Sequence, residues 1–384
     1  MNGENMKHVY LDNNATTRLR PEVLEEMLPY LSEDYGNASS IHWFGQEARR
    51  AMDLARDRVA NFIGASPNEI IFTSGGTEAD NQALLGIADA YGKPGSRIIT
   101  TTIEHQAVLN SCRHLEKKGF MVSYLPVDGQ GRIDLGTLAD CLDDDVILIS
   151  IMLANNEVGT IQPVKEAAEL AKSKGILFHT DAVQAAGRIP LDVRRLGVDL
   201  LSLSGHKLHG PKGCGALFVR SGITAPVLIH GGHHESSRRA GTENVAAIAG
   251  FGRACNLAAT KNGEANLAVE SLRDRLEKGI LERVSGVKVN GSSEHRLPNT
   301  LNVSFEGVDG QFLAMDLDIA GIAVSTGSAC KSDMRDPSYV LAAMGCSLKE
   351  ATGCIRFSLG ADNTEAEIDF VLDTLPKLVE ELRD

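Results

Sequence analysis

The 384-residue sequence has no uninterrupted apolar run long enough to cross a bilayer as a helix. Its first residues, MNGENMKHVY, show neither an apolar signal core nor an arginine-rich amphipathic stretch, so we expect no targeting segment. With 43% hydrophobic and 23% charged residues, the composition is typical of a globular protein. We therefore expect a cytoplasmic protein without a membrane partner.

Basic residues are outnumbered. The chain has 38 Lys and Arg against 51 Asp and Glu, which gives a formal net charge of −13 at pH 7. A surface of this sign repels a phosphate backbone, so we expect no nucleic-acid partner. The same charge is compatible with docking to a basic protein.

No two of the seven cysteines have C-x-x-C spacing. This excludes a typical zinc site or dithiol redox motif, and we expect no bound metal. The scatter of the cysteines suggests a reducing compartment with mostly buried thiols. Six of them are best interpreted as small core residues: Cys112, Cys141, Cys214, Cys255, Cys346 and Cys354.

The seventh, Cys330, raises a separate question because it stands in STGSACKS, residues 325–332. Glycine and serine make such a stretch flexible, and we expect an exposed loop. An exposed thiol is a liability unless it reacts. By itself the loop leaves two interpretations open, a reactive cysteine and an ordinary small residue in a turn.

Apolar, strand-like runs alternate with helix-like segments from about residue 45 to 260. Several of these runs are apolar throughout, as expected of central strands covered on both faces. The strand candidates are EIIFTS, RIITT, DDVILISIML, GILFHTDA, VDLLSLSG and GALFVR. The alternation predicts an α/β fold with a mostly parallel, doubly wound sheet.

After about residue 260 the pattern changes. Helices are expected over 264–284 and 363–382, and they bracket the shorter strands LPNTLNVSF and CIRFSLG. This mixture predicts a smaller α+β domain. The expected organisation is a large domain over residues 16–260 and a small domain of residues 1–15 and 261–384, with the cysteine loop at about 325–335.

In an open α/β sheet, ligands bind beyond the carboxyl ends of the strands. One strand candidate, EIIFTS, runs into Gly75-Gly76-Thr77 at the start of a helix. The free N–H groups and the dipole of a helix N-terminus favour an anion such as phosphate. The stretch lacks both the P-loop and the GxGxxG spacing, so helix capping alone is an equally good explanation of these residues.

Two further strand ends carry a set of polar side chains. GILFHTDAVQ supplies His179, Asp181 and Gln184, and VDLLSLSGHKLHGPKG supplies Ser204, His206 and Lys207. Pyridoxal phosphate (PLP) needs a lysine for its Schiff base, an acid against the pyridine nitrogen and a phosphate cradle. Each residue alone has an ordinary structural explanation. Together, at successive strand ends, they favour a PLP site.

Other polar residues have both a structural and a functional explanation. His105 follows the strand RIITT, where it could be structural or could stack on a cofactor ring and move protons. Asn155 and Asn156 in LANNEVG could be turn residues or cofactor ligands. Arg356 in CIRFSLG could be an ordinary arginine or a bidentate clamp for a carboxylate.

The run HGGHHESSRRAGTEN clusters three histidines with two arginines. Adjacent His233 and His234 without a nearby thiolate are poorly spaced for zinc. We therefore expect a loop at the rim of the active site or at a subunit interface.

These residues carry a resemblance. From YLDNNATT (10–17) to its end, the chain resembles the cysteine desulfurases of the NifS/IscS type, which are homodimeric fold-type-I PLP enzymes. The motifs that carry it are GNASSIHWFGQEAR, FTSGGTEADN, EHQAV, NNEVGT, HTDAVQ, SGHKLHGPKG, RRAGTEN, STGSACKS and IRFSLG. The chain departs from the family pattern at Arg18, at Ala38 and in the GGHHE segment (231–235), whose role the resemblance leaves uncertain.

The resemblance implies a role for each candidate residue. Lys207 would form the Schiff base, Asp181 would face the pyridinium nitrogen, Gln184 would face the ring hydroxyl, and His105 would stack on the ring. Arg356 would hold the carboxylate of L-cysteine, and Cys330 would be the nucleophile. The remaining cofactor contacts would come from Gly76, Thr77, Asn156, Ser204, His206 and, from the other subunit, Thr242; Asn156 would also contact substrate.

The implied reaction converts L-cysteine to L-alanine and leaves the sulfur on Cys330 as a persulfide. An acceptor protein such as an iron–sulfur scaffold would then take the sulfur, and a tRNA-thiolation enzyme is an alternative acceptor. Two other functions compete. One is another PLP activity, as selenocysteine lyase or aminotransferase, although an aminotransferase needs no thiol. The other is a sulfur carrier without PLP chemistry, against which Lys207 and Asp181 argue.

Overall fold

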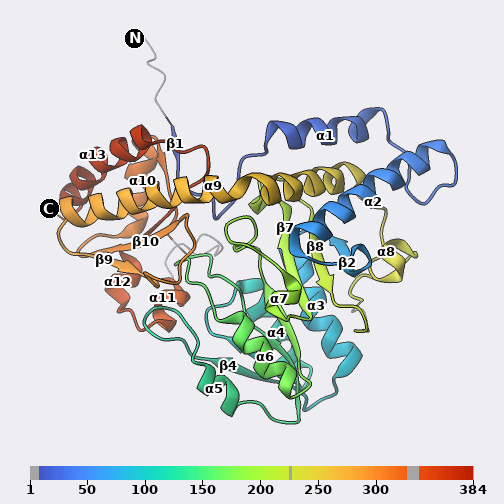
Figure 1. Cartoon of the computed structure of the whole chain (residues 1–384). Helices are drawn as coiled ribbons and strands as arrows, with labels where there is room; N and C mark the ends of the chain where they lie inside the picture. The colour runs from blue at the N-terminus through green and yellow to red at the C-terminus, as the bar shows by residue number, and fades with distance from the viewer. Residues whose placement is uncertain (1–7, 225–226, 327–336, 384) are drawn as a thin grey trace.

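A seven-stranded sheet forms the centre of the computed structural model, which describes residues 8–224, 227–326 and 337–383 (Figure 1). Its order is β2 (Ile70–Thr73), β8 (Gly215–Val219), β7 (Leu200–Ser204), β6 (Leu177–Asp181), β5 (Val146–Ser150), β3 (Arg97–Thr101) and β4 (Met121–Leu125). The strands from β7 to β4 are parallel, whereas β8 is antiparallel to both of its neighbours. The predicted α/β fold with a mostly parallel sheet is confirmed.

Both faces of this sheet are covered, which is why its strands read as continuous apolar runs. Successive side chains point to opposite faces: Ile71 belongs to the cluster under α3 and α4, and Ile70 to the cluster on the other face. The covering helices are α2 (Trp43–Ile63), α3 (Gly76–Tyr91), α4 (Gln106–Lys117), α5 (Leu135–Asp140), α6 (Val164–Ser173) and α7 (Val193–Leu196). Two short 3₁₀ helices adjoin the sheet: η1 (Pro67–Glu69) directly precedes β2, and η2 (Gly205–Lys207) directly follows β7.

A second, smaller unit lies at the other end of the molecule (Figure 1). Its antiparallel sheet has the order β12 (Cys354–Ser358), β10 (Thr300–Phe305) and β9 (Val287–Asn290). Nearby, β1 (Val9–Tyr10) pairs in parallel with β11 (Ile322–Ala323). The helices of this unit are α10 (Gly310–Ile319), α11 (Tyr339–Ala343), α12 (Leu348–Thr352) and α13 (Glu365–Glu381).

One long helix, α9 (Val245–Arg283), connects the two units. It packs against α1 (Pro21–Ser32) and α2 at one end and against α13 and β10 at the other. The helix expected over 264–284 is present, but its predicted start was wrong, because the helix already begins at Val245 and continues without a break. Residue 260 therefore lies inside a helix, and the division into domains at that point stays a prediction. No helix in the described ranges combines the length and hydropathy of a membrane span.

Candidate active site

A cavity of about 460 Å³ opens where the parallel strands of the large sheet end. Its volume falls in the range of small-molecule and cofactor sites. It is lined by Asn14, Ala15, Gly76, Thr77, Asp80, His105, Met152, Asn156, Asp181, Val183, Gln184, Ser204, His206, Lys207 and Arg356. Ten of the residues singled out from the sequence thus meet in one place: Gly76, Thr77, His105, Asn156, Asp181, Gln184, Ser204, His206, Lys207 and Arg356.

The floor of one end of the cavity is the N-terminus of α3. Gly75 has φ +154° and ψ −177°, a conformation that L side chains rarely adopt, and it turns the chain from β2 into the helix. A Cβ on Gly76 would come within 2.7 Å of Val183 Cγ2, so a side chain there would fill the space above the helix end. The free N–H groups of α3 therefore face an open cradle that suits an anion.

Ser204 and His206 lie at the end of β7 and in η2, and Ser204 borders this cradle: a Cβ on Gly76 would lie 3.6 Å from Ser204 Cβ. His206 Nδ1 lies 3.1 Å from Thr16 Oγ1. Burial, aided by Lys207 and Lys212, lowers the pKa of His206 to about 4. The imidazole is thus neutral at physiological pH, and it can donate only one hydrogen bond.

Lys207 points into the cavity from η2, next to the N-terminal segment. Its Nζ donates to the carbonyl oxygen of Asn14 and, at 2.8 Å, to that of Ala15. These two carbonyl oxygens hold the Lys207 amine in a defined position. It is therefore placed to react with a molecule that enters the cavity.

Asp181 ends β6 on the opposite side and is 6% exposed. Its Oδ1 accepts the Val183 N–H at 2.9 Å. Gln184 lies one turn further on, where its Nε2 donates to the Asn14 carbonyl at 2.9 Å and its Oε1 accepts from Arg188 at 3.0 Å. Both side chains are held by hydrogen bonds, so their orientation toward the cavity is fixed.

Arg356 reaches the cavity from β12 of the smaller sheet. It is 3% exposed and donates to the Asn156 carbonyl at 3.0 Å and to Asp12 Oδ1 at 2.7 Å. Its Nε and the side-chain Oδ1 of Asn156 are buried without a hydrogen-bond partner in the described part of the chain. These two polar atoms are therefore available to bond a molecule that enters the cavity.

His105 is the N-cap of α4, and its Nδ1 accepts the Ala107 N–H at 3.2 Å. This bond occupies Nδ1, and the His105 ring lines the main cavity. His105 therefore caps α4, which is a structural role. A catalytic role for the same side chain remains compatible with this.

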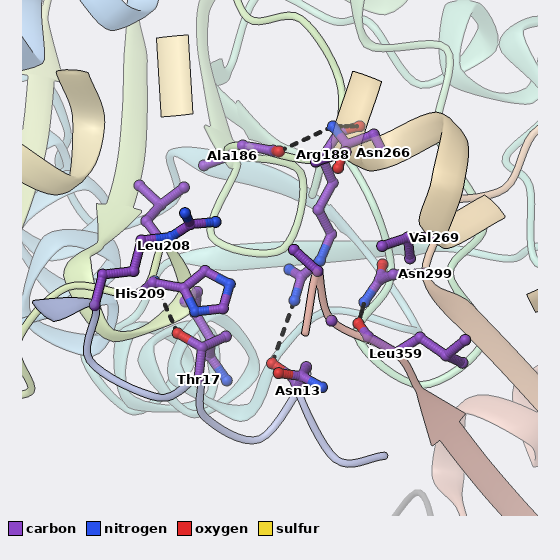
Figure 2. A pocket seen from close by; sticks show the side chains of 16 residues that line it. Asn13, Thr17, Ala186, Arg188, Leu208, His209, Asn266, Val269, Asn299 and Leu359 are labelled. Carbon is purple, nitrogen blue, oxygen red and sulfur yellow. Dashed lines mark hydrogen bonds between the residues drawn. The ribbon is translucent and has the colours of Figure 1, made fainter. Parts of the chain in front are cut away.

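A second cavity shares Lys207 with the first and has a volume of only about 50 Å³. Figure 2 shows side chains that line it. Arg188 crosses it, donating to the Asn13 carbonyl at 3.2 Å, and Asn266 donates to the Arg188 carbonyl at 2.9 Å. A space of this size holds one or two water molecules. This cavity is too small for a cofactor. Arg188, which lines it, holds Gln184 in place by donating to its Oε1.

Three buried titratable residues at or near the main cavity were assigned no role from the sequence, namely Asp80, Glu104 and His179, although His179 was already placed at a strand end. Asp80 stands in the motif FTSGGTEADN and Glu104 directly precedes His105, but their complete burial has no signal in the sequence. Burial raises the pKa of Glu104 to about 8, although the Met152 N–H and the Thr101 hydroxyl bind its Oε1 at 2.9 Å. Its Oε2 has no partner among the described residues.

Replacing Glu104 with glutamine is expected to change how stability depends on pH. Because the folded-state pKa is raised to about 8, the native state holds a proton that the unfolded chain releases above about pH 4.3. This carboxyl therefore stabilises the fold fully at low pH, and the contribution is lost as the pH rises to about 8, by up to about 1.4 kcal/mol per pH unit. Denaturant unfolding from pH 5 to 9 should show Glu104→Gln gaining stability relative to the parent protein as the pH rises; parallel curves would contradict this.

Thr242 and the GGHHE segment lie apart from the cavity. Thr242 is exposed and does not line it. The short helix α8 (His234–Ser237) contains Glu235. The Glu235 carboxylate accepts two hydrogen bonds from the Arg56 guanidinium, at 2.5 and 2.8 Å, and one from the Phe72 N–H at 3.0 Å. Within the described ranges, no group of three or more His, Cys, Asp or Glu side chains could hold a metal ion.

Glu235, Ser236 and Ser237 all have positive φ, at 48°, 57° and 66°. Non-glycine residues adopt this conformation at a cost, so another interaction must hold it. The buried pair between Arg56 and Glu235 anchors the segment to β2.

Replacing Arg56 with methionine is expected to destabilise the protein by about 3–5 kcal/mol, because it leaves the buried Glu235 carboxylate unpaired. The control on the same helix is Arg50→Met. Arg50 pairs with Glu47 but is 60% exposed, so its loss is expected to cost about 0–1 kcal/mol. Denaturant unfolding measures both; equal effects would show that the Arg56 pair is not what anchors α8.

Cys330 lies outside the described residues. The described residues on either side of it are tied to the cavity wall. Ser325 pairs with Arg356 through two backbone hydrogen bonds, and the Tyr339 hydroxyl donates to the Glu104 carbonyl at 2.6 Å. The segment that carries Cys330 therefore leaves and rejoins the described structure beside Arg356 and His105.

The cavity fits PLP by its own features. The α3 cradle, which a Cβ would fill, suits the phosphate together with Ser204 and His206. Asp181 is a buried acid of the kind that faces a pyridinium nitrogen, and Lys207 supplies the amine. The donor set is that of an organic phosphate carrying a carbonyl group.

Comparisons with known proteins agree with this geometry. The chain matches the family described as Aminotransferase class-V over residues 9–371. It is 50% identical to "Cysteine desulfurase IscS" of Clostridium botulinum (strain Hall) over 380 residues, 98% of this chain and 96% of that protein. It is 51% identical to "Cysteine desulfurase IscS" of Methanosarcina thermophila over 386 residues, 100% of this chain and 95% of that one.

Two solved structures have the same fold. One, "NIFS-LIKE PROTEIN", superimposes with a TM-score of 0.92 at 44% sequence identity, over 98% of this chain and 100% of the other. The other, "SspA in complex with cysteine", has a TM-score of 0.83 at 36% identity, over 93% of this chain and 100% of the other.

Proposed function

Because this chain belongs to the aminotransferase class-V family and, within it, to the cysteine desulfurases, we propose that its main cavity binds PLP and L-cysteine. The products are L-alanine and a persulfide on Cys330. The observation that carries the proposal is the meeting of Lys207, Asp181 and the α3 cradle in one cavity with Arg356. Lys207 supplies the amine and Asp181 the acid for the ring nitrogen. The α3 cradle supplies the phosphate site, and Arg356 supplies the carboxylate site.

The residues that would hold PLP come from the ends of five strands, β2, β3, β5, β6 and β7. Gly76, Thr77, Ser204 and His206 would bind the phosphate, and Asp181 would hold a negative charge against the ring nitrogen. Gln184 would face the ring hydroxyl, His105 would stack on the ring, and Asn156 would add a polar contact. When bound, PLP accepts the electron pair that remains on the substrate Cα after its proton leaves.

Arg356 orients the substrate by its carboxylate. Its guanidinium is already fixed by Asp12 and by the Asn156 carbonyl, and its Nε has no partner among the described residues. A planar guanidinium held in this way binds a carboxylate with a defined geometry. The Cα proton of L-cysteine then faces Lys207, which removes it and later returns it.

Cys330 receives the sulfur. Its thiol sulfur bonds to the substrate sulfur as the carbon–sulfur bond breaks, so the substrate carbon is reduced and the two sulfurs are oxidised to the persulfide level. The thiol must lose its proton to attack, because an ordinary cysteine is mostly protonated at neutral pH. His105, at the cavity wall beside the anchored ends of the cysteine segment, takes that proton.

The persulfide then passes to an acceptor protein, such as an iron–sulfur scaffold, and the enzyme acts as a homodimer. The exposed apolar side chains around α1 and α2 support an interface there. They are Leu24, Leu28, Leu31, Tyr35, Ile41, Trp43 and Phe44. Thr242, exposed in the single chain, would complete the phosphate site of the other subunit.

The test is to incubate the protein, reconstituted with PLP, with L-cysteine and a reducing thiol and to quantify L-alanine and sulfide. Equal amounts of both products are expected, with a persulfide mapped to Cys330 when the thiol is omitted. Pyruvate in place of L-alanine, or no product with PLP bound, would contradict the proposal. Repeating the assay with candidate acceptors identifies the one that accelerates sulfur release.

A further inference from the structure

A second acid lies beside Asp181 and has no part in the proposed reaction so far. Asp80, on α3, lines the main cavity although it is only 1% exposed. Its Oδ1 has no hydrogen-bond partner in the described ranges, and it lies 3.7 Å from His179 Nε2. Two buried carboxyl groups therefore share one wall of the cavity.

His179 does not provide a positive charge for Asp80. The imidazole is completely buried on β6, with Nδ1 2.8 Å from Ser150 Oγ and Nε2 3.0 Å from Ser202 Oγ. Burial lowers the pKa of His179 to about 3, so the ring is neutral. Two serine hydroxyls satisfy both nitrogens of a neutral ring, since a hydroxyl can donate or accept.

The groups that face the two carboxyls differ in sign. Burial raises the pKa of Asp80 well above its usual range, and the charges of Asp181 and Glu104 raise it further, although a hydrogen bond from Ser202 opposes this. Burial also raises the pKa of Asp181, but His105, the Val183 N–H and Lys207 all act to lower it. Negative charge is therefore better tolerated on Asp181 than on Asp80.

Two interacting carboxyl groups in one buried cavity do not readily both ionise, because a negative charge on one disfavours a negative charge on the other. We propose that Asp80 is a positioning residue that keeps its own proton, so that the single negative charge of the pair stays on Asp181, opposite the cofactor nitrogen. This rests on the proposed function, because it gives Asp80 its purpose through PLP. The surroundings of the two acids differ. Asp181 accepts the Val183 N–H and lies near His105 and Lys207, whereas Asp80 has the Ser202 hydroxyl, a neutral imidazole and neighbouring acids around it.

Infrared spectroscopy of the PLP-bound enzyme near pH 7 tests where the proton is. A neutral carboxylic acid has a carbonyl stretch separate from that of a carboxylate, and both Asp80 and Glu104 are expected to give one. Asp80→Asn should remove one of these bands, and Glu104→Gln, the matched control, should remove the other. If Asp80→Asn leaves every acid band in place, Asp80 is ionised and the proposal is overturned.

PLP binding tests where the charge is. Asp181→Asn is expected to raise the dissociation constant of PLP by about 30-fold or more, as for loss of one partner in a buried charge pair. Asp80→Asn, which keeps the shape and the neutral state, should raise it by about threefold or less. Equal or reversed effects would overturn the proposal. Asp80→Ala repeats both measurements if Asp80→Asn does not fold.

The two proposals fail in different ways. If the parent protein does not bind PLP at all, the proposed function fails, but the assignment of the acid bands still decides which carboxyl is protonated. If PLP binds and L-alanine forms while Asp80→Asn behaves like Asp181→Asn, only the role of Asp80 fails.

Discussion

Replacing Lys207 with alanine is expected to abolish turnover of L-cysteine, with a loss of at least about 10³-fold in kcat, within the range for a positioned acid–base group. Lys207 Nζ is the amine in the cavity, held by the carbonyl oxygens of Asn14 and Ala15. Alanine removes both the group that reacts with PLP and the base that moves the Cα proton. L-alanine formation under saturating L-cysteine measures the loss, and the absorbance of lysine-bound PLP should disappear with it.

The matched control is Lys212→Ala. Lys212 lies five residues further on and is exposed, so its replacement removes the same charge without removing a side chain that lines the cavity. Thermal unfolding of both variants checks the fold. A Lys207→Ala protein that still produces L-alanine at a tenth or more of the parent rate would show that another group is the base.

Replacing Cys330 with alanine is expected to leave PLP bound and to eliminate the protein persulfide. The proposed reaction places the transferred sulfur on this thiol alone. The other cysteines are poor substitutes: burial raises the pKa of Cys112, Cys214 and Cys354 to about 12. A buried thiol with a raised pKa has almost no thiolate at neutral pH. Mass spectrometry after incubation with L-cysteine measures the persulfide.

Cys346→Ala is the control for this experiment, because Cys346 is only half-buried and is the kind of thiol that could take sulfur by accident. We expect Cys346→Ala to keep the persulfide and full activity. Complete conversion of L-cysteine to L-alanine by Cys330→Ala, without added thiol, would contradict the role given to Cys330.

The sequence predicted the large sheet and most of the site for one physical reason. Buried parallel strands are continuous apolar runs, and the polar residues that follow them must lie at the carboxyl edge of the sheet. Asp181 and Lys207 follow two such runs, and the structure brings them to one cavity. The match to the cysteine desulfurase family, predicted from the motifs, is confirmed.

What the sequence did not reveal depends on contacts between distant segments. Asp80 and Glu104 are buried because helices pack on the sheet. In the sequence, both residues resemble ordinary acidic residues of a helix or loop. The pair between Arg56 and Glu235 joins residues 179 positions apart. The start of α9 was missed because its first turns, VAAIAGFG, are too rich in alanine and glycine to show a one-sided apolar pattern.

The segment from Asn13 to Thr17 has a mechanical consequence. Asn14 donates to Thr300 Oγ1 on the small sheet and to the Asn156 carbonyl at the large one, and its own carbonyl holds the Lys207 amine. Thr17 in turn donates to the His206 carbonyl at 2.8 Å. The segment is hydrogen-bonded to both units. A displacement of the small sheet would therefore also move the Asn14 carbonyl, which positions the reactive amine. Motion of one unit and the reach of the lysine are thereby linked through five residues of backbone.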